Sequence, residues 1–308
     1  MTAPGARRMA LPERYDFAGI VDEIAMGRHD PCARVATGGF WWATRTPDGP
    51  GTLCLSRDGR ELVATAYGPG AAWLLDQADG VAGLRDDVSG FAELAARHPV
   101  VAELARVHSG FRLPATGLIF PRLLRIIFEQ KVTGKEAYRA YAGTIRHFHV
   151  RSGREPAPGP LPGLMLPPDP DAVAATPYWV FHPMGVEQRR SDTVCRAARE
   201  AANLQRSADA AEATRRMTAI PGIGPWTAAE VVRAVYGDPD AVSVGDYHIP
   251  NTVAWNLAGK PRGDDAFMLE LLKPFRGHRG RVCALLERAG AAAPRFGPRL
   301  PVRSFASF

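Results

Sequence analysis

A turn between two helical patterns, within residues 217–229, constrains the fold of this chain more than any other segment. The stretch reads MTAIPGIGPWTAA, in which Pro221 and Gly222 predict a tight turn. Gly224 permits a positive φ and removes a side chain from the surface, and Pro225 suits the first turn of the following helix. We expect a hairpin whose backbone amides are exposed at a helix N-terminus, where a DNA phosphate can bind. For this motif alone, an ordinary connection between two helices is the alternative.

An acidic residue follows the second of these helical patterns. Asp246 lies 22 residues after Gly224, a distance that one helix and a return loop can fill. Its carboxylate can therefore return to the phosphate-binding end of the hairpin. Because another helical pattern begins directly after Asp246, its structural role is that of a helix N-cap.

The chain has 308 residues, which suggests about two domains, and its patterning divides it into four segments. Residues 1–10 are expected to form a loose tail. Residues 11–86 contain short aromatic and β-branched runs separated by Asp-Gly turns, which predict a β-rich α/β domain. Residues 87–290 show helical periodicity, and residues 291–308 form a basic, Pro- and Arg-rich tail. The predicted fold class is α+β, with a small β-rich N-terminal domain and an all-helical domain that contains the hairpin.

Positive charge is concentrated in two blocks. The formal net charge is +6, but residues 122–154 carry a net +6 and residues 273–308 a net +7, so the remainder carries −7. Two solvated basic faces are the simplest interpretation, and contacts with DNA phosphates are the alternative.

No motif for a catalytic metal or a membrane span is found in the sequence. Its four cysteines lie far apart, without a C-x-x-C pair, so we expect no zinc or iron–sulfur site. There is no apolar run of about 18 residues, and no apolar stretch follows Arg7 and Arg8. We expect a soluble, cytoplasmic protein, associated with the nucleoid in a bacterium.

Several segments in a fixed order resemble the helix-hairpin-helix DNA glycosylases, most closely 3-methyladenine DNA glycosylase II. Besides the hairpin, residues 127–132 (IFEQKV) resemble the I-L-x-Q-x-V segment of that family. Asp246 and Tyr247 resemble its catalytic Asp-Tyr pair, and residues 274–276 resemble its C-terminal aromatic-basic segment. The resemblance covers most of the chain and implies that residues 87–290 form the glycosylase domain.

The resemblance implies base excision repair of double-stranded DNA by a monomer without a cofactor. The enzyme would flip an alkylated purine of the 3-methyladenine type and hydrolyse its N-glycosidic bond, leaving an abasic site. Asp246 is the expected catalytic residue, because a carboxylate stabilises the positive charge that develops on the sugar. Bifunctional relatives place a nucleophilic lysine where Trp226 stands, and tryptophan cannot form a Schiff base, so we expect no AP-lyase activity.

The substrate pocket and the DNA contacts follow from the same matched positions. Trp226 and Tyr247 are expected to stack on an alkylated base, with core packing as the alternative. Glu230 stands where the relative typically has an aromatic residue, and could accept from an exocyclic amine, attract a cationic base or pair with an arginine. Lys131 stands where relatives insert a wedge into the duplex, with a solvated lysine as the alternative. The other expected DNA contacts are Gln130, Gly222, Gly224, Thr227, His248 and Arg276.

The resemblance further implies a monovalent cation on the backbone of Thr218, Ile220 and Ile223, and no catalytic metal. Two other functions stay open. A non-catalytic DNA-damage-binding protein could keep the hairpin, although binding alone needs neither Asp246 nor an aromatic pocket. The second alternative is a glycosylase for deaminated bases such as hypoxanthine or uracil, which the carboxylate at Glu230 would permit.

Overall fold

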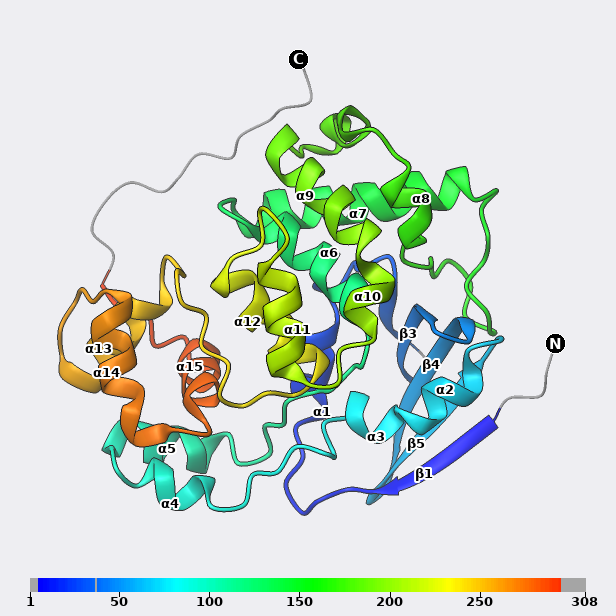
Figure 1. Ribbon diagram of the computed structural model, residues 1–308. Coiled ribbons are helices and arrows are strands. Elements are labelled where there is room, and N and C mark those ends of the chain that lie inside the picture. The colour runs from blue at the N-terminus through cyan, green and yellow to red at the C-terminus, as the bar shows by residue number, and fades with distance from the viewer. Residues whose placement is uncertain (1–4, 37, 295–308) are drawn as a thin grey trace.

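An antiparallel sheet forms the N-terminal part of the computed structural model, which describes residues 5–36 and 38–294. Its strand order is β1-β5-β4-β3-β2 (Figure 1). The strands are β1 (Gly5–Ala10), β2 (Ala33–Ala36), β3 (Gly39–Thr46), β4 (Gly49–Asp58) and β5 (Glu61–Tyr67). Tight turns join β3 to β4 and β4 to β5, as the Asp-Gly signals predict.

Residues 5–10 do not belong to a loose tail, so that part of the prediction for residues 1–10 is wrong. β1 pairs with β5 along its whole length, from Gly5 opposite Ala66 to Ala10 opposite Glu61. Arg7 donates to the carbonyl of Leu75 at 3.0 Å. The sequence does not predict this strand, because Arg7 and Arg8 interrupt the apolar pattern. The residues that they contact, Leu75 and Glu61, lie far along the chain. Of the predicted C-terminal tail 291–308, residues 295–308 lie outside the described part.

Each face of the sheet is covered by a different part of the chain. One face packs against α1 (Phe17–Ile24), α2 (Ala71–Asp76) and α3 (Ala78–Val81), with Leu53, Leu55 and Leu62 in the core between them. On the other face, Trp41 and Cys54 pack against Leu164 and Leu166 of the proline-rich connection. Both faces of the sheet are therefore covered.

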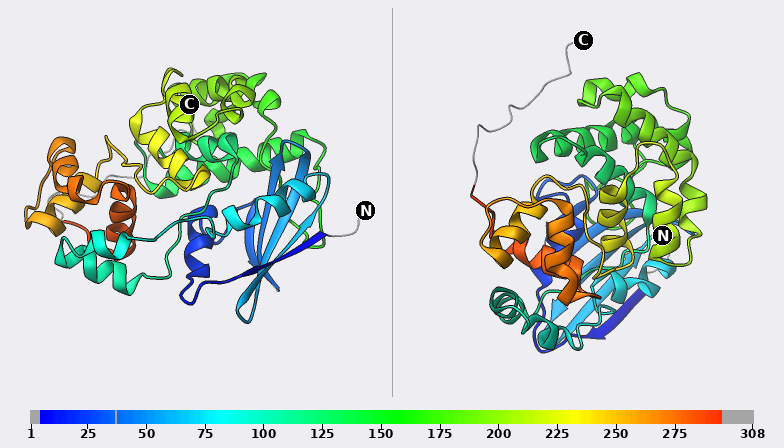
Figure 2. Two further views of the ribbon diagram at one scale, coloured as in Figure 1. Left: turned by 60° about the horizontal axis from the view of Figure 1, so that its bottom comes forward. Right: turned by 60° about the vertical axis from the view of Figure 1, so that its left-hand side comes forward.

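The helical part contains two hydrophobic cores. The first core is built from α6 (Ile119–Glu129), α7 (Gly134–Arg151), α8 (Pro170–Ala174), the 3-10 helix η1 (Tyr178–Met184), α9 (Gln188–Arg199), α10 (Ala201–Gln205), α11 (Ala210–Thr218) and α12 (Pro225–Val235). The second core is built from α4 (Phe91–Ala95), α5 (Pro99–Val107), α13 (Ile249–Ala258), α14 (Asp265–Leu272), η2 (Lys273–Phe275) and α15 (Arg279–Arg288). Figure 2 shows this second group at the end of the molecule opposite the sheet. Residues 236–248 cross from the first core to the second.

Much of the positive charge in the two basic blocks holds the fold together, which neither interpretation of the blocks predicts. Arg281 is 1% exposed and forms an ion pair with the buried Asp86, with 2.5 Å between Nη2 and Oδ1. Arg279 pairs with Asp240 and Arg288 with Asp16, each at 2.6 Å. In the first block, Arg122 donates to the carbonyl of Glu23 and Arg125 to that of Ile24. These contacts join the second core and α1 to the rest of the chain.

None of the helices within the described residues is both long and apolar enough to cross a membrane.

Candidate functional site

The hairpin predicted from residues 217–229 is present between α11 and α12. Gly222 has a φ of +100°, and a Cβ on it would lie 2.1 Å from Oγ1 of Thr193, so this position requires glycine. Gly224 has a φ of −106°, so the positive φ expected there is found at Gly222 instead. Gly224 is the N-cap of α12 and no side chain caps this helix end. With Pro225 at the start of the helix, its first amides are left for an external anion.

Two side chains brace this hairpin turn (residues 219–224). Nε2 of Gln130 donates to the carbonyl of Gly222 at 3.1 Å and to Oγ1 of Thr227 at 2.9 Å. Nη1 of Arg196 donates to the carbonyl of Pro221 at 3.0 Å. Gln130 and Thr227 are expected as DNA contacts, but here they bind each other, and Thr227 is only 2% exposed. Their contact fixes the connection between α6 and α7 against the hairpin.

The connection between α6 and α7 (residues 130–133, the wedge loop) contains Lys131. Lys131 is exposed and has a φ of +55°, a conformation that costs a residue with a side chain about 1–3 kcal/mol. A capping box of Thr133 and Glu136 begins α7 directly behind it. The strained backbone is held between two anchored neighbours, which suits a residue that must be presented at a surface.

Asp246 is fixed by three hydrogen bonds. Its Oδ1 accepts from the backbone amides of His248 at 2.6 Å and Ile249 at 2.8 Å, and its Oδ2 accepts from Nε1 of Trp226 at 3.0 Å. The N-cap of α13 is His248 and not Asp246 as the sequence predicts. Asp246 lies two residues before this cap but still accepts from the first amides.

The expected aromatic residues are placed differently from each other. Trp226 is half-buried against the first core and contacts Asp246 directly, so these two predicted residues are brought together. Tyr247 is 79% exposed, and its ring meets that of His248 edge-on at 4.9 Å. Tyr247 and His248 therefore lie on the surface beside the site, and Arg276 is exposed after η2.

Glu230 is buried one turn after Trp226, and of its three possible roles the structure shows pairing with an arginine. Its Oε2 accepts from Nη2 of Arg233 at 2.7 Å, and its Oε1 accepts from the hydroxyl of Ser243. Burial acts to raise the pKa of Glu230, but Arg233 and Ser243 outweigh it and hold this pKa below its usual value. The carboxylate thus ties α12 to the segment that carries Asp246.

Glu287, on α15, is a further titratable residue near the site. Glu287 is exposed by surface area. Partial desolvation of its carboxyl group by the surrounding atoms still raises its pKa to about 7, opposed by Arg233 and assisted by the negative charges of Glu230 and Asp246. The sequence offers no signal for the contact of Ser243 with Glu230, because the two residues lie on different segments of the chain. The spacing of Glu230 and Arg233, three residues apart on one helix, could have indicated their pairing.

A cation at the hairpin would need oxygen or nitrogen atoms that can coordinate it. The carbonyl of Ile220 accepts from the amide of Ile223 at 3.0 Å, which leaves one of its lone pairs. Among residues 5–36 and 38–294, no group of three or more His, Cys, Asp or Glu side chains is placed to hold a metal ion. Backbone carbonyls are therefore the donors that a cation would meet at the hairpin.

Substitution of the two hairpin glycines should have unequal effects. Gly222→Ala places a Cβ against Thr193 at a positive φ, so we expect a loss of about 1–3 kcal/mol in the free energy of unfolding, measured with urea. Gly224→Ala is the matched control, because no atom lies within 4 Å of its added Cβ and its φ is ordinary. Equal losses in the two variants would contradict this account of the turn.

The raised pKa of Glu287 predicts a pH-dependent stability. The folded state keeps the proton between the ordinary pKa of 4.5 and about 7, so stability falls as the pH rises through this range. We expect Glu287→Gln to gain stability relative to the wild type at pH 8 but not at pH 5, as measured by urea unfolding at both pH values. Glu270→Gln, on α14, controls for the loss of one carboxylate. The same difference at both pH values would show that Glu287 titrates normally.

No protein-family model matches the chain. The chain is 26% identical over 262 residues to a probable bifunctional transcriptional activator/DNA repair enzyme AlkA of Mycobacterium tuberculosis. The match covers 79% of this chain and 49% of that protein, so the chain spans about half the length of the curated relatives it matches.

Solved structures show the same fold over almost the whole chain. A 3-methyladenine DNA glycosylase from Archaeoglobus fulgidus superimposes with a TM-score of 0.76 at 15% identity, covering 92% of this chain and 98% of that one. An 8-oxoguanine glycosylase/lyase from Clostridium acetobutylicum gives a TM-score of 0.67 at 13% identity, covering 92% and 95%. The chain therefore has the fold of the 3-methyladenine and 8-oxoguanine DNA glycosylases, and the resemblance to helix-hairpin-helix DNA glycosylases that its motifs predict is confirmed.

Proposed function

We propose that this chain is a monofunctional DNA glycosylase of base excision repair, acting as a monomer on double-stranded DNA. Its substrate would be an alkylated purine of the 3-methyladenine type. The observation that carries the proposal is the Asp246 carboxylate, which three N–H donors hold beside Trp226. Two relatives described above, a probable DNA repair enzyme and a 3-methyladenine DNA glycosylase, support the same class of reaction.

The reaction can be derived from the arrangement around Asp246. An alkylated purine carries a positive charge, so it can leave as a neutral base when the bond from C1′ to its nitrogen breaks and the electron pair goes to the base. The sugar is left with the positive charge, which the Asp246 carboxylate stabilises. Water then adds to C1′ and loses a proton, for which a free lone pair of the same carboxylate is an acceptor. Trp226 offers an aromatic face to a cationic base.

The absence of a suitable amine supports hydrolysis without strand cleavage. A glycosylase/lyase needs an amine at the site to form a Schiff base with the sugar. The chain has four lysines, and none lies within residues 217–248. The side chain that donates to Asp246 is Trp226, which cannot form a Schiff base. We therefore infer an abasic site, with an intact strand, as the product.

The DNA would contact the surface formed by the hairpin turn and the wedge loop. The uncapped end of α12 would hold a phosphate, and Lys131 would enter the space left by the flipped base. His248 and Arg276, both exposed, would contact the backbone nearby. A monovalent cation on the carbonyls of Thr218, Ile220 and Ile223 would add positive charge next to this phosphate.

Asp246→Asn provides the direct test of the proposed activity. We expect this variant to lose at least about 100-fold in the excision rate while it keeps its affinity for duplex DNA, because the hairpin is unchanged. The assay uses duplexes with single 3-methyladenine-type, 7-methylguanine, hypoxanthine or uracil lesions, followed by alkaline cleavage of abasic sites.

Three outcomes of this assay would count against the proposal. A wild-type protein that produces no abasic site from any lesion is not a glycosylase for these bases. A fully active Asp246→Asn variant would move the catalytic role to another residue. Strand breaks without alkali would show lyase activity.

A further inference from the structure

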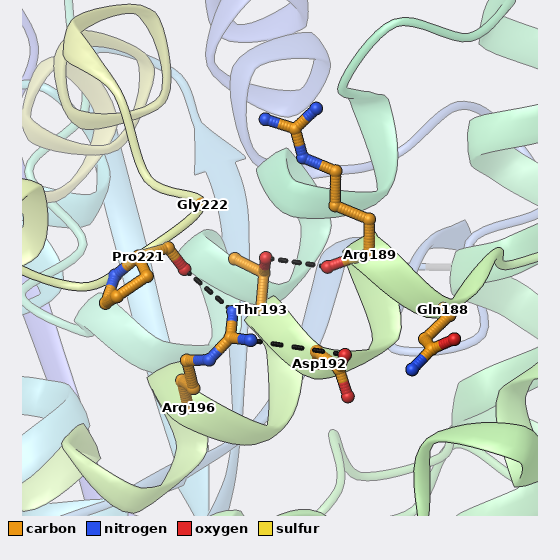
Figure 3. Close-up of a pocket in the computed structure, with 7 residues that line it drawn as sticks. All are labelled: Gln188, Arg189, Asp192, Thr193, Arg196, Pro221 and Gly222. Carbon is orange, nitrogen blue, oxygen red and sulfur yellow. Dashed lines mark hydrogen bonds and ion pairs between the residues drawn. The ribbon is translucent and has the colours of Figure 1, made fainter.

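A hollow of about 550 Å³ lies between α9 and the hairpin turn. It is lined by α9 residues between 188 and 196 and by Pro221 and Gly222, as Figure 3 shows. This hollow lies outside the contacts around Asp246, and the mechanism derived above makes no use of it. Its position directly beside the hairpin raises the question of what it binds.

Four contacts make the hollow, the hairpin and the wedge loop one continuous surface. Arg196 donates to Pro221, and the bare Cα of Gly222 lies so close to Thr193 that no side chain fits between them. Next to Arg189, the buried Arg190 donates through Nη1 to the carbonyl of Phe128 at 2.8 Å. Phe128 lies at the end of α6, just before the wedge loop, and Gln130 is the first residue of this loop and donates to Gly222. The hollow, the hairpin and the wedge loop are therefore held in fixed positions.

The charge of the hollow is positive at its rim. Arg196 and Asp192 lie 4.0 Å apart and largely balance each other. Arg189 is exposed, and its guanidinium has no hydrogen bond or ion pair with any residue in the described part of the chain. In Figure 3 its side chain extends away from Asp192 and Arg196. With Lys131 on the adjoining wedge loop, this leaves two uncompensated cations beside the uncapped end of α12.

We propose that this hollow is a second contact for the DNA backbone, in which Arg189 binds a phosphate beyond the one held by the hairpin. The inference rests on the proposed function for its partner. A guanidinium presents paired donors that match phosphate oxygens, and the surface is continuous with the hairpin. Such a contact positions the duplex and carries no sequence information.

The test is the salt dependence of binding to an undamaged duplex of about 20 base pairs, measured by fluorescence anisotropy for the wild type, Arg189→Gln and Arg199→Gln. Each lost phosphate contact lowers the slope of log K against log[salt] by about 1. We expect this reduction in Arg189→Gln, with weaker binding at low salt. Arg199 is the matched control, because it is exposed at the other end of α9 and does not line the hollow.

The outcomes separate this inference from the proposed function. An unchanged slope in Arg189→Gln, or an equal reduction in Arg199→Gln, overturns the second contact. A wild-type protein that binds DNA but excises no base overturns the proposed function and leaves this test valid. A wild-type protein that does not bind the duplex overturns both. Urea unfolding of each variant checks that the fold is intact.

Discussion

The hydrogen bond from the indole of Trp226 to the carboxylate of Asp246 is the contact on which the candidate site depends. It joins α12, whose first turn belongs to the hairpin, to the segment that crosses into the second core. Glu230 repeats this link one turn later through the hydroxyl of Ser243. One face of α12 therefore sets the position of the proposed catalytic group relative to the phosphate-binding end of the same helix.

Charge is used in two ways in this molecule. Arginines at the junctions, such as Arg281 with Asp86 and Arg288 with Asp16, are neutralised and hold the second core against the rest. Arg189 and Lys131, beside the hairpin, stay exposed. The formal net charge of the whole chain is therefore a poor guide to the DNA-facing surface, since burial and pairing decide which cations remain available.

Local motifs in the sequence predicted much of the site, and tertiary contacts supplied the rest. The hairpin, Asp246 and Trp226 were predictable, because turn residues and helix starts depend on neighbours in the chain. The roles of Gly222 and Gly224 were exchanged, since the need for glycine at position 222 comes from Thr193 on another helix. Gln130 and Thr227, predicted as DNA contacts, are joined by a hydrogen bond that sequence patterns do not indicate. Strand β1 was missed because its partner strand lies far along the chain.

Single-turnover excision by Trp226→Phe tests the central claim most directly. Phenylalanine keeps an aromatic ring against the first core but removes the N–H that orients Asp246. A hydrogen bond to a charged group contributes about 1.5–3 kcal/mol, so we expect the excision rate to fall roughly ten- to hundredfold with unchanged affinity for DNA. Combined with Asp246→Asn, the substitution should cause little further loss. A Trp226→Phe variant that excises at the wild-type rate would contradict the claim that this contact positions the catalytic carboxylate.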